Sequence, residues 1–413
     1  MREAVSRGVA FNLGAVGLAQ AVRQAHGQER VARSVLLPNL SSSLREVEQQ
    51  TYLRALGIQA PFIPALVGPF NYFDLRATLT QNIADATAIN NYRSAQEARH
   101  ANELSLNDAR DLVVLAVGGA YLQAIAAQAR VDAERAQVQS AKALYEQTQQ
   151  RRQVGLSAQI EVNQALVQLQ TQQQRLATLE NDLAKQKINV ARLTGLPPTD
   201  KYQLTDQVPY ADAPSLSAED ALKQAFENRA DLQAASKQVL SAERSRSAAR
   251  AERYPSLAVN ADYGAIGLRP SQAHGTFSVT GTLRIPIWAG GRTEGDIEQA
   301  KAALDQRRAE LEDTRSRIES EVRNALFDLQ AAANQVEVSR NNRQVARETL
   351  NLTRQRFEAG VTDTVEVVQS QASLASADLD YITSLFAHNL AKLSLARALG
   401  NTETRLPQFL KLQ

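Results

Sequence analysis

The chain has 413 residues and a formal net charge of +2, and long stretches are rich in alanine, glutamine, arginine and glutamate. This composition is typical of long packed helices, while the near-neutral, interspersed charge gives no basic surface for a nucleic acid. The sequence has no cysteine, which excludes thiolate chemistry and disulfides, and no run of about 18 apolar residues, so we expect no transmembrane helix, although the short strands of a β-barrel would escape this test.

The sequence repeats itself at an interval of 360 − 155 = 205 positions. A pattern of threonine, glutamine, arginine, glutamate and valine around Gly155 recurs in the same order around Gly360. Upstream, Pro38 matches Pro255 at 255 − 38 = 217, so the first copy holds 217 − 205 = 12 extra residues, which we place between Arg54 and Phe70. The predicted organisation is a first structural repeat at 1–200, an inter-repeat linker at 201–216, a second repeat at 217–400 and a C-terminal tail at 401–413.

The first copy is expected to begin with a helix, followed by two strands that flank the loop at 54–70. The second strand, at 73–80, alternates apolar and polar residues, which is the period expected of a strand. The first strand, from about Leu40, alternates poorly. A long helix then leads to a turn, and a second helix returns from it. The residues of that turn are Val154, Gly155, Leu156 and Ser157.

The second copy follows the same order, with clearer strand signals at 257–263 and 277–285. Its long helix carries an apolar stripe with heptad spacing between Ile297 and Val336, which is typical of coiled-coil packing and not of a globular core. From Gly291 to about Gln355 the helix would be about 100 Å long at 1.5 Å per residue. The turn that ends it consists of Ala359, Gly360, Val361 and Thr362.

The predicted strands have one apolar face and one polar face. Four such strands cannot close a barrel alone, and open sheet edges are not tolerated in lipid, so we expect several copies of the chain to share one barrel. A water-filled lumen would accommodate charges that a packed core excludes. The charged residues that the alternation places on the polar face are Asp74, Arg76, Asp262 and Arg284.

The two-copy plan, the Pro-x-Leu starts of the first strands, the strand-to-helix junction at 283–291 and the two glycine turns together resemble the TolC-like outer-membrane efflux proteins. The resemblance implies a mainly α fold with a small β portion. Long coiled-coil-like helices would form an α-barrel, and four strands per protomer would contribute to a trimeric 12-stranded transmembrane β-barrel. The homotrimer would lie in the bacterial outer membrane, in contact with its lipid, and extend into the periplasm.

The resemblance also implies a function. The chain would be the outer-membrane channel of a tripartite efflux or type I secretion system, a passive exit duct that works with a periplasmic adaptor protein and an inner-membrane pump. Enzymatic activity, a cofactor and a metal are not expected, and neither is a nucleic-acid partner. The four histidines are scattered, and His388 takes the place of Leu183 in the other copy, which favours a structural role for it.

Two interpretations of the turns stay open. In the first, they are turn chemistry only, with each glycine in the left-handed conformation and Ser157 or Thr362 as the N-cap of the returning helix. In the second, the turns at 154–157 and 359–362 also dock the adaptor, as the equivalent turns do in the family. Phe357 and Thr362 differ from the tyrosine and arginine that latch the entrance in well-known members, so that latch is not carried over.

Two acids, Glu161 and Glu366, lie six residues after the turn glycines. A carboxylate near a helix N-terminus is stabilised by the helix dipole whether or not it has another role. The resemblance implies instead that both acids line the periplasmic entrance of the channel, where three copies would form a ring that attracts cations. Gln369, at a second acidic position of the family, is neutral here and would weaken that ring.

The main alternative is a periplasmic coiled-coil adaptor, that is, a membrane-fusion protein of such a pump. Adaptors concentrate their β-structure in several compact domains, whereas here short strand pairs recur inside a duplicated helical plan. A soluble coiled-coil scaffold is a second alternative, and it does not explain the alternating strands.

Overall fold

The computed structural model describes residues 1–59, 61–200, 202–206, 210–212 and 216–410. The chain divides into two compact units: unit 1 comprises Met1–Gln20, Glu103–Gln233 and Glu312–Gln413, and unit 2 comprises Ala21–Asn102 and Ala234–Leu311. Each unit takes segments from both sequence repeats. The sequence repeats therefore do not correspond to the two spatial units, and their boundaries stay a prediction. The linker expected at 201–216 and the tail at 401–413 lie partly outside the described residues.

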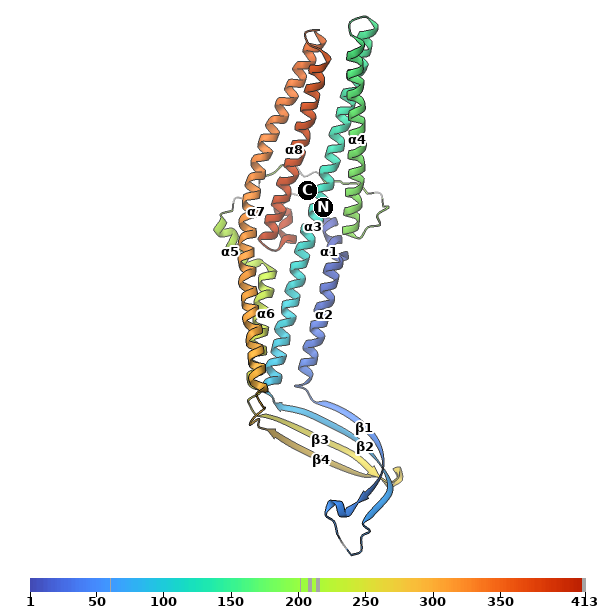
Figure 1. Ribbon diagram of the computed structural model, residues 1–413, viewed down its shortest axis with the longest axis vertical. Coiled ribbons are helices and arrows are strands. Elements are labelled where there is room, and N and C mark those ends of the chain that lie inside the picture. The colour runs from blue at the N-terminus through green and yellow to red at the C-terminus, as the bar shows by residue number, and fades with distance from the viewer. Residues whose placement is uncertain (60, 201, 207–209, 213–215, 411–413) are drawn as a thin grey trace. The chain divides into compact units, whose positions relative to one another are not determined.

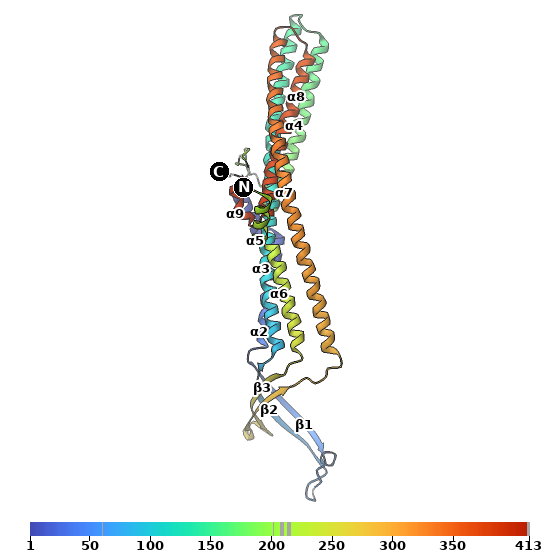
Figure 2. The same ribbon diagram turned by 90° about the vertical axis from the view of Figure 1, so that its left-hand side faces the viewer.

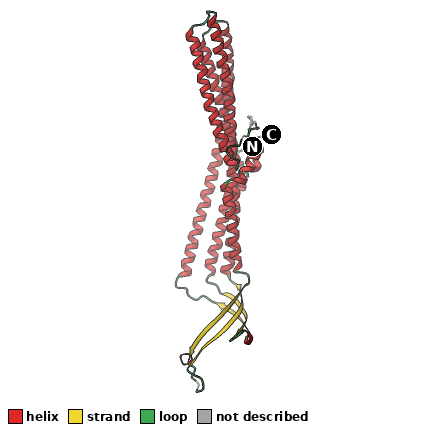
Figure 3. Ribbon diagram, turned by 90° about the vertical axis from the view of Figure 1, so that its right-hand side faces the viewer, coloured by secondary structure: helices red, strands yellow, loops and turns green. Residues whose placement is uncertain are grey.

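Unit 2 contains an antiparallel sheet, drawn in yellow in Figure 3. Its strand order is β1-β2-β3-β4. β1 pairs with β2 and β3 with β4, and the β2–β3 ladder joins the two hairpins. β1 is 14 residues long although its sequence alternates poorly. Within the described chain β1 and β4 are the edges of this sheet. The strands are β1 (Asn39–Tyr52), β2 (Leu66–Ala84), β3 (Ser256–Gly267) and β4 (His274–Arg284).

The two faces of the sheet differ as the alternation predicts. Leu44 pairs with Leu75 on one face, where large apolar side chains are exposed. On the other face Arg76 donates a hydrogen bond of 3.2 Å to Asp74 and forms an ion pair with Asp262 across the β2–β3 ladder. Arg284 lies on this polar face too, because it follows Thr282 and Thr280 in alternation on β4. The predicted grouping of the four charged residues is confirmed.

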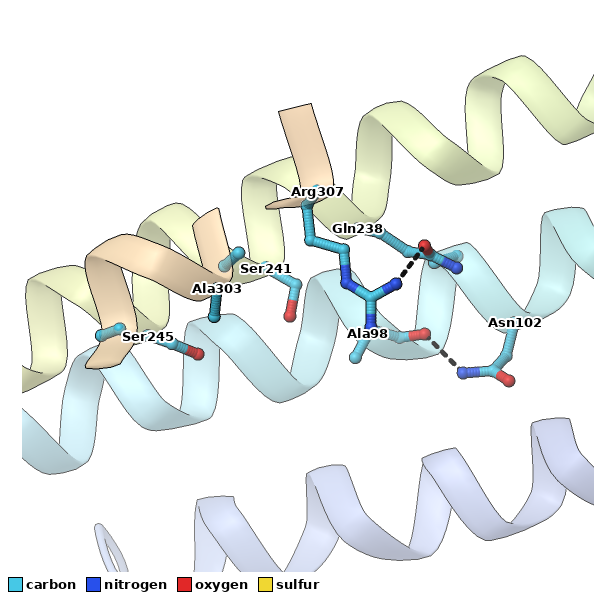
Figure 4. A pocket seen from close by; sticks show the side chains of 10 residues that line it. Ala98, Asn102, Gln238, Ser241, Ser245, Ala303 and Arg307 are labelled. Carbon is cyan, nitrogen blue, oxygen red and sulfur yellow. Dashed lines mark hydrogen bonds between the residues drawn. The ribbon is translucent and has the colours of Figure 1, made fainter. Parts of the chain in front are cut away.

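The helices of unit 2 pack through small residues. Ser94 of α3 (Ala86–Gln153) donates a 2.9 Å hydrogen bond to the carbonyl oxygen of Ser241 in α6 (Ala230–Ala251), and small side chains let two helices approach closely. A groove lined by residues of α3, α6 and α7 (Arg292–Glu358) follows this seam, and Arg307 reaches Gln238 at its rim, 3.5 Å away (Figure 4). α2 (Leu13–Ser34) begins in unit 1 and continues in unit 2.

Unit 1 is built on two helical hairpins that lie side by side (Figures 1 and 2). In the first, α3 leads into α4 (Gln159–Thr194), and in the second, α7 leads into α8 (Thr364–Ala398). The two long helices were predicted, and α3 and α7 have 68 and 67 residues. The hairpins share an apolar cluster with heptad-like spacing, as coiled-coil packing requires. Its buried members are Leu144, Ala165, Leu350, Phe357, Val367 and Leu374.

Three shorter helices complete unit 1: α1 (Arg2–Phe11), α5 (Ala218–Asn228) and α9 (Thr402–Leu410). Contrary to the expectation from the sequence, α3 does contain an 18-residue window that could cross a membrane by its length and composition. Half of that window is buried, and α3 supplies Val114, Val117 and Leu122 to an apolar cluster that includes Val5 of α1. This burial is typical of a helix in the core of a folded unit, which meets the same criteria of length and composition.

Two polar groups of unit 1 are buried beside these clusters. Arg229, only 1% exposed, follows α5 and donates a 2.7 Å hydrogen bond to Asp231 and another to Glu321. Burial alone would raise the pKa of Asp231, but the hydrogen bond and charge of Arg229 outweigh it and lower that pKa. His388 is buried in α8, where its ring stacks on Tyr210 with 4.9 Å between centroids.

Candidate functional site

The two hairpin turns of unit 1 have the same backbone geometry. Gly155 and Gly360 adopt φ values of +78° and +75°, in the left-handed region that glycine enters without strain. The residue after each glycine donates its backbone N–H five residues back, Leu156 to the Arg151 carbonyl and Val361 to the Arg356 carbonyl, both over 2.8 Å. This is the Schellman arrangement that satisfies the last carbonyls of a helix. The left-handed conformation predicted for the two turn glycines is confirmed.

The predicted N-caps lie one residue too early. α4 is capped at Ala158, whose side chain offers no hydrogen bond, and α8 is capped at Asp363, which accepts a 3.1 Å hydrogen bond from the Glu366 N–H. The hydroxyls of Ser157 and Thr362 donate instead to the carboxylates of Glu161 and Glu366. The expectation that Ser157 and Thr362 cap the helices is therefore wrong, because these hydroxyls are used by the acids four residues ahead.

Both acids occupy the first turn of their helices, as predicted. Their surroundings differ in charge. Glu366 forms an ion pair of 3.0 Å with Arg356, which lies at the end of α7, and its side chain remains 41% exposed. For Glu161 the hydrogen bond from Ser157 is 2.5 Å long. Both carboxylates therefore accept a hydrogen bond from a hydroxyl, and Glu366 has in addition a cation that partly compensates its charge.

The remaining predicted residues of this region are at the surface. Gln369 is exposed on α8. At the turns themselves the exposed side chains include apolar ones, Val154 and Leu156 in the first turn and Val361 in the second. Ala359 is exposed as well. Each turn thus presents an apolar surface on a rigid backbone.

Exposed apolar side chains continue from the turns into a shallow groove between α4 and α8. Ile160 and Val167 line it from α4, and Val365 and Val368 line it from α8, with Asn163, Gln164 and Gln168 beside them. Ile160, Val167 and Val365 are exposed. This groove was not predicted from the sequence, although Ile160 and Val167 are one heptad apart, a spacing that places them on the same face of a helix.

The two turns are joined through Arg151, which sequence reasoning also missed. Its guanidinium lies 4.6 Å from the centroid of the Phe357 ring, and its Nη1 donates a 2.8 Å hydrogen bond to the Phe357 carbonyl oxygen. This carbonyl belongs to the last turn of α7, where carbonyls are satisfied by groups outside the helix, and it also accepts a 3.1 Å hydrogen bond from the Gly360 N–H. Arg151 therefore caps the partner hairpin and holds the two turns together.

A second surface of unit 1 bears on assembly. α7 has two apolar stripes on opposite faces, because residues at 7-residue spacing return to the same side of a helix. One stripe, which includes Val336 and Leu350, is buried within the chain. The second stripe is exposed and consists of Phe327, Val338, Val345 and Leu352, which are 58 to 70% exposed. Such a stripe is typical of a contact between helices.

Among the residues that the structure describes, no group of three or more histidine, aspartate or glutamate side chains is placed to hold a metal ion. The residues gathered at the turns offer hydroxyls, carboxylates, guanidiniums and apolar side chains. This arrangement suits the binding of a partner surface and the attraction of ions.

The sequence and the structure were compared with known proteins. The sequence model of the family described as outer membrane efflux protein matches residues 17–196 and 221–401. The pyoverdine export outer membrane protein OpmQ of Pseudomonas putida is 24% identical over 385 residues, which cover 92% of this chain and 81% of OpmQ.

Solved structures have the same fold. The CmeC outer membrane channel of Campylobacter jejuni matches with a TM-score of 0.82 at 18% identity, covering 99% of this chain and 88% of CmeC. The outer membrane protein VceC of Vibrio cholerae matches with a TM-score of 0.80 at 19% identity, covering 96% of this chain and 95% of VceC. At these identities the likeness concerns the fold alone.

Proposed function

The chain belongs to the outer membrane efflux protein family. We propose that it acts as a homotrimer that binds a periplasmic adaptor and works with an inner-membrane pump. Membership makes the chain an outer-membrane efflux channel that extends into the periplasm. The resemblance noted in the sequence is confirmed, and the periplasmic adaptor considered as an alternative is not supported. Channels of this family are trimers that work with adaptors and pumps.

The observation that carries the trimer proposal is that the sheet has two free edges, β1 and β4, in the described chain. A sheet in lipid must close on itself, because unpaired backbone groups cannot be solvated there. Pairing of β1 of one copy with β4 of the next removes both edges. The exposed stripe of α7 supports the same arrangement, since a neighbouring copy would cover Val338, Val345 and Leu352.

The trimer is tested by the mass of the detergent-solubilised particle. We expect the mass of three chains, and a stable monomer would contradict the proposal. A Val345→Glu substitution places a charge in the exposed stripe and should shift the particle towards smaller species. Gln344→Glu is the matched control, because it adds the same charge at a polar, exposed position of α7 and should leave the mass unchanged.

We further propose that the two turns, at 154–157 and 359–362, dock the adaptor. Three features support this: the turns expose apolar side chains, they are rigid because of their Schellman geometry, and the groove that begins at Ile160 and Val365 continues their apolar surface. Val154→Asp with Val361→Asp should weaken capture of the adaptor by the intact channel. The particle mass of this variant should stay that of the wild type.

Glu161 and Glu366 are proposed to line the periplasmic entrance of this channel. Both are in the first turn of a helix that starts at a tip, so three copies would bring up to six carboxylates together. Confined like charges draw in cations and resist anions. Because Arg356 pairs with Glu366 and Gln369 is neutral, we expect moderate cation selectivity and no tight block by divalent ions.

A further inference from the structure

The two β-hairpins of unit 2 differ in length. The β2–β3 ladder ends at the pair Phe73 and Gly267, whereas β1 and β2 continue to pair as far as Tyr52 and Leu66. The first hairpin therefore projects past the second and carries the longer loop (Figure 1). We call its described residues, 53–59 and 61–65, the β1–β2 loop. This is where the first repeat holds its extra residues.

The β1–β2 loop is ordered by its own backbone. Leu53 donates a 2.8 Å hydrogen bond to the Ala65 carbonyl, and Ile58 closes a turn on the Leu53 carbonyl over 3.1 Å. Leu53–Leu56 is a short 3-10 helix that ends at Gly57. Apolar side chains nevertheless point outward: Phe62 is 97% exposed, and Leu56, Ile58 and Ile63 are exposed too. Four large apolar side chains exposed between positions 56 and 63 mark this loop as an interaction site.

A β-bulge at the base of the loop determines on which face of the sheet Leu66 lies. Between Gln49 and Thr51 the register shifts by one residue of β2, which puts Leu66 opposite Tyr52. The shift reverses the alternation of β2, so Leu66 joins Tyr52 on the face that carries Leu44. Gly68 makes the bulge possible, because a Cβ there would lie 2.7 Å from the Gln49 carbonyl oxygen. Leu66 and Tyr52 at the base of the loop therefore lie on the Leu44 side of the sheet, with the exposed Glu46 and Glu48 of β1 between them and Leu44.

The charge of this segment distinguishes between its possible partners. Arg54 is the only charged residue between positions 49 and 73. If the loops of three copies met over the channel exit, their three Arg54 guanidiniums would approach one another in apolar surroundings. No carboxylate of this segment would compensate them, and burying uncompensated like charges costs free energy. A leaflet with phosphate groups supplies the missing negative charge, and arginine can lay its aliphatic stem on apolar material while its head reaches the phosphates.

We propose that the β1–β2 loop docks on the outer leaflet of the outer membrane, with Phe62 and Leu56 among the acyl chains and Arg54 at the phosphates. Both hairpin loops are at the ends of the strands away from the helices, so they lie on the outer side of a channel whose helices extend into the periplasm. The loop is then an anchor that fixes the barrel against the lipid. This inference depends on the outer-membrane location and not on the proposed entrance or adaptor contacts.

The test uses the single native tryptophan, Trp288. In a Trp288→Phe background, Phe62→Trp reports on the β1–β2 loop, and Gln272→Trp reports on the shorter β3–β4 loop as a control. The trimers are reconstituted into phosphatidylcholine–phosphatidylglycerol vesicles with bromine atoms on the acyl chains. We expect a blue-shifted emission for Phe62→Trp that loses most of its intensity to brominated lipid and little to aqueous iodide. The control should respond to iodide and not to bromine.

Two outcomes would overturn the proposal. Quenching of Phe62→Trp by iodide alone would show that the loop stands in water, and quenching by neither agent would show that the neighbouring protomers cover it. The role of the charge is tested by adding Arg54→Gln, which should reduce bromine quenching in these anionic vesicles but not in vesicles of phosphatidylcholine alone. An equal response in both vesicles would show that Arg54 does not interact with the negative charge of the leaflet, and this part of the proposal would be wrong.

A conductance measurement separates the lipid anchor from a plug made by three loops. Phe62→Ser with Leu56→Ser removes the apolar surface without changing charge. If the loop lies on the lipid, the single-channel conductance of the trimer stays that of the wild type. A severalfold rise in conductance would mean that the loops obstruct the exit, and the proposal would then be wrong.

Discussion

Arg151 at the end of α3 caps the last turn of α7 through the carbonyl oxygen of Phe357 and covers that residue's ring with its guanidinium. The contact joins two residues that are 206 positions apart in the sequence and belong to different hairpins. It therefore links the two turns directly to each other.

Arg151→Ala should loosen the turns without unfolding unit 1. The variant loses a cation–π contact and a hydrogen bond from a charged donor, together on the order of 1–3 kcal/mol. Hydrogen exchange should accelerate at the backbone amides of 152–158 and 356–362 and stay unchanged in the rest of α3. Arg152→Ala, an exposed neighbour, is the control. Equal exchange in the two variants would show that the Arg151 contact does not hold the turns.

The turn glycines should tolerate no β-branched residue. A Cβ at Gly155 or Gly360 would meet no atom within 4 Å, so the cost of Gly155→Val with Gly360→Val comes from the left-handed backbone alone, about 1–2 kcal/mol for each turn. We expect the trimer to assemble and efflux to fail, measured as drug sensitivity in cells that depend on this channel. Unchanged drug resistance would show that the turns are not the docking site.

Substitution of Arg229 should destabilise unit 1 more than most other substitutions. Its removal by Arg229→Met takes away the closest partner of Asp231, a carboxylate that is 12% exposed and keeps only the longer 3.4 Å contact with Arg317. Breaking a buried pair typically costs about 3–5 kcal/mol, and the remaining contact should place the cost at the lower end. The thermal unfolding midpoint of the solubilised particle should fall markedly, and the second change Asp231→Leu should restore much of it. Arg323→Met, which breaks an exposed pair with Glu319, should have almost no effect. A midpoint that Arg229→Met leaves unchanged would contradict this account of the buried pair.

The stability of unit 1 should fall in acid through His388. Burial, with Lys392 nearby, lowers its pKa to about 4 from the ordinary 6.5. The unfolded chain therefore binds a proton that the folded chain excludes, so this contribution to stability is complete above pH 6.5 and is lost as the pH falls towards 4, by on the order of 3 kcal/mol.

His388→Leu reproduces the residue of the other repeat, Leu183, and should flatten the decrease in unfolding midpoint between pH 7 and pH 4.5. The control is His26→Gln, at an exposed position, which should keep the wild-type profile. If the profile of His388→Leu matched that of the wild type, another group would be responsible for the acid sensitivity.

The sequence predicted the long helices and the glycine turns because heptad spacing and the 205-residue repeat are local or periodic signals. It predicted the polar face of the sheet for the same reason, since alternation alone assigns Asp74 and Arg76 to one side. β1 alternates poorly, with Ser41, Ser42 and Ser43 in succession, and its presence followed from the repeat more than from its own residues.

The parts that could not be predicted depend on contacts between distant segments. Nothing near Arg151 indicates that its partner is Phe357, because that contact follows from how two hairpins pack. The N-caps were misplaced by one residue because Ser157 and Thr362 are good cap residues, and only the structure shows their hydroxyls turned to Glu161 and Glu366. The pairing of Arg356 with Glu366 likewise crosses a turn, and it alters the expected charge of the entrance.

The charge of the entrance gives a prediction with a defined sign. Glu161→Gln with Glu366→Gln should lower cation selectivity, and Arg356→Gln should raise it, because it removes the cation that compensates Glu366. Reversal potentials in a salt gradient across planar bilayers measure both effects, which should shrink as salt rises and screening shortens the reach of the charges. Identical reversal potentials for all three proteins would show that these acids only stabilise their helices.

The central claim, that three copies of this chain form a channel in a membrane, is tested most directly by single-channel recording of the purified particle in planar lipid bilayers. The account predicts discrete conductance steps of uniform size from particles with the mass of three chains, and no steps from the monomeric fraction of Val345→Glu. A particle of trimer mass that inserts into the bilayer and never conducts would contradict it.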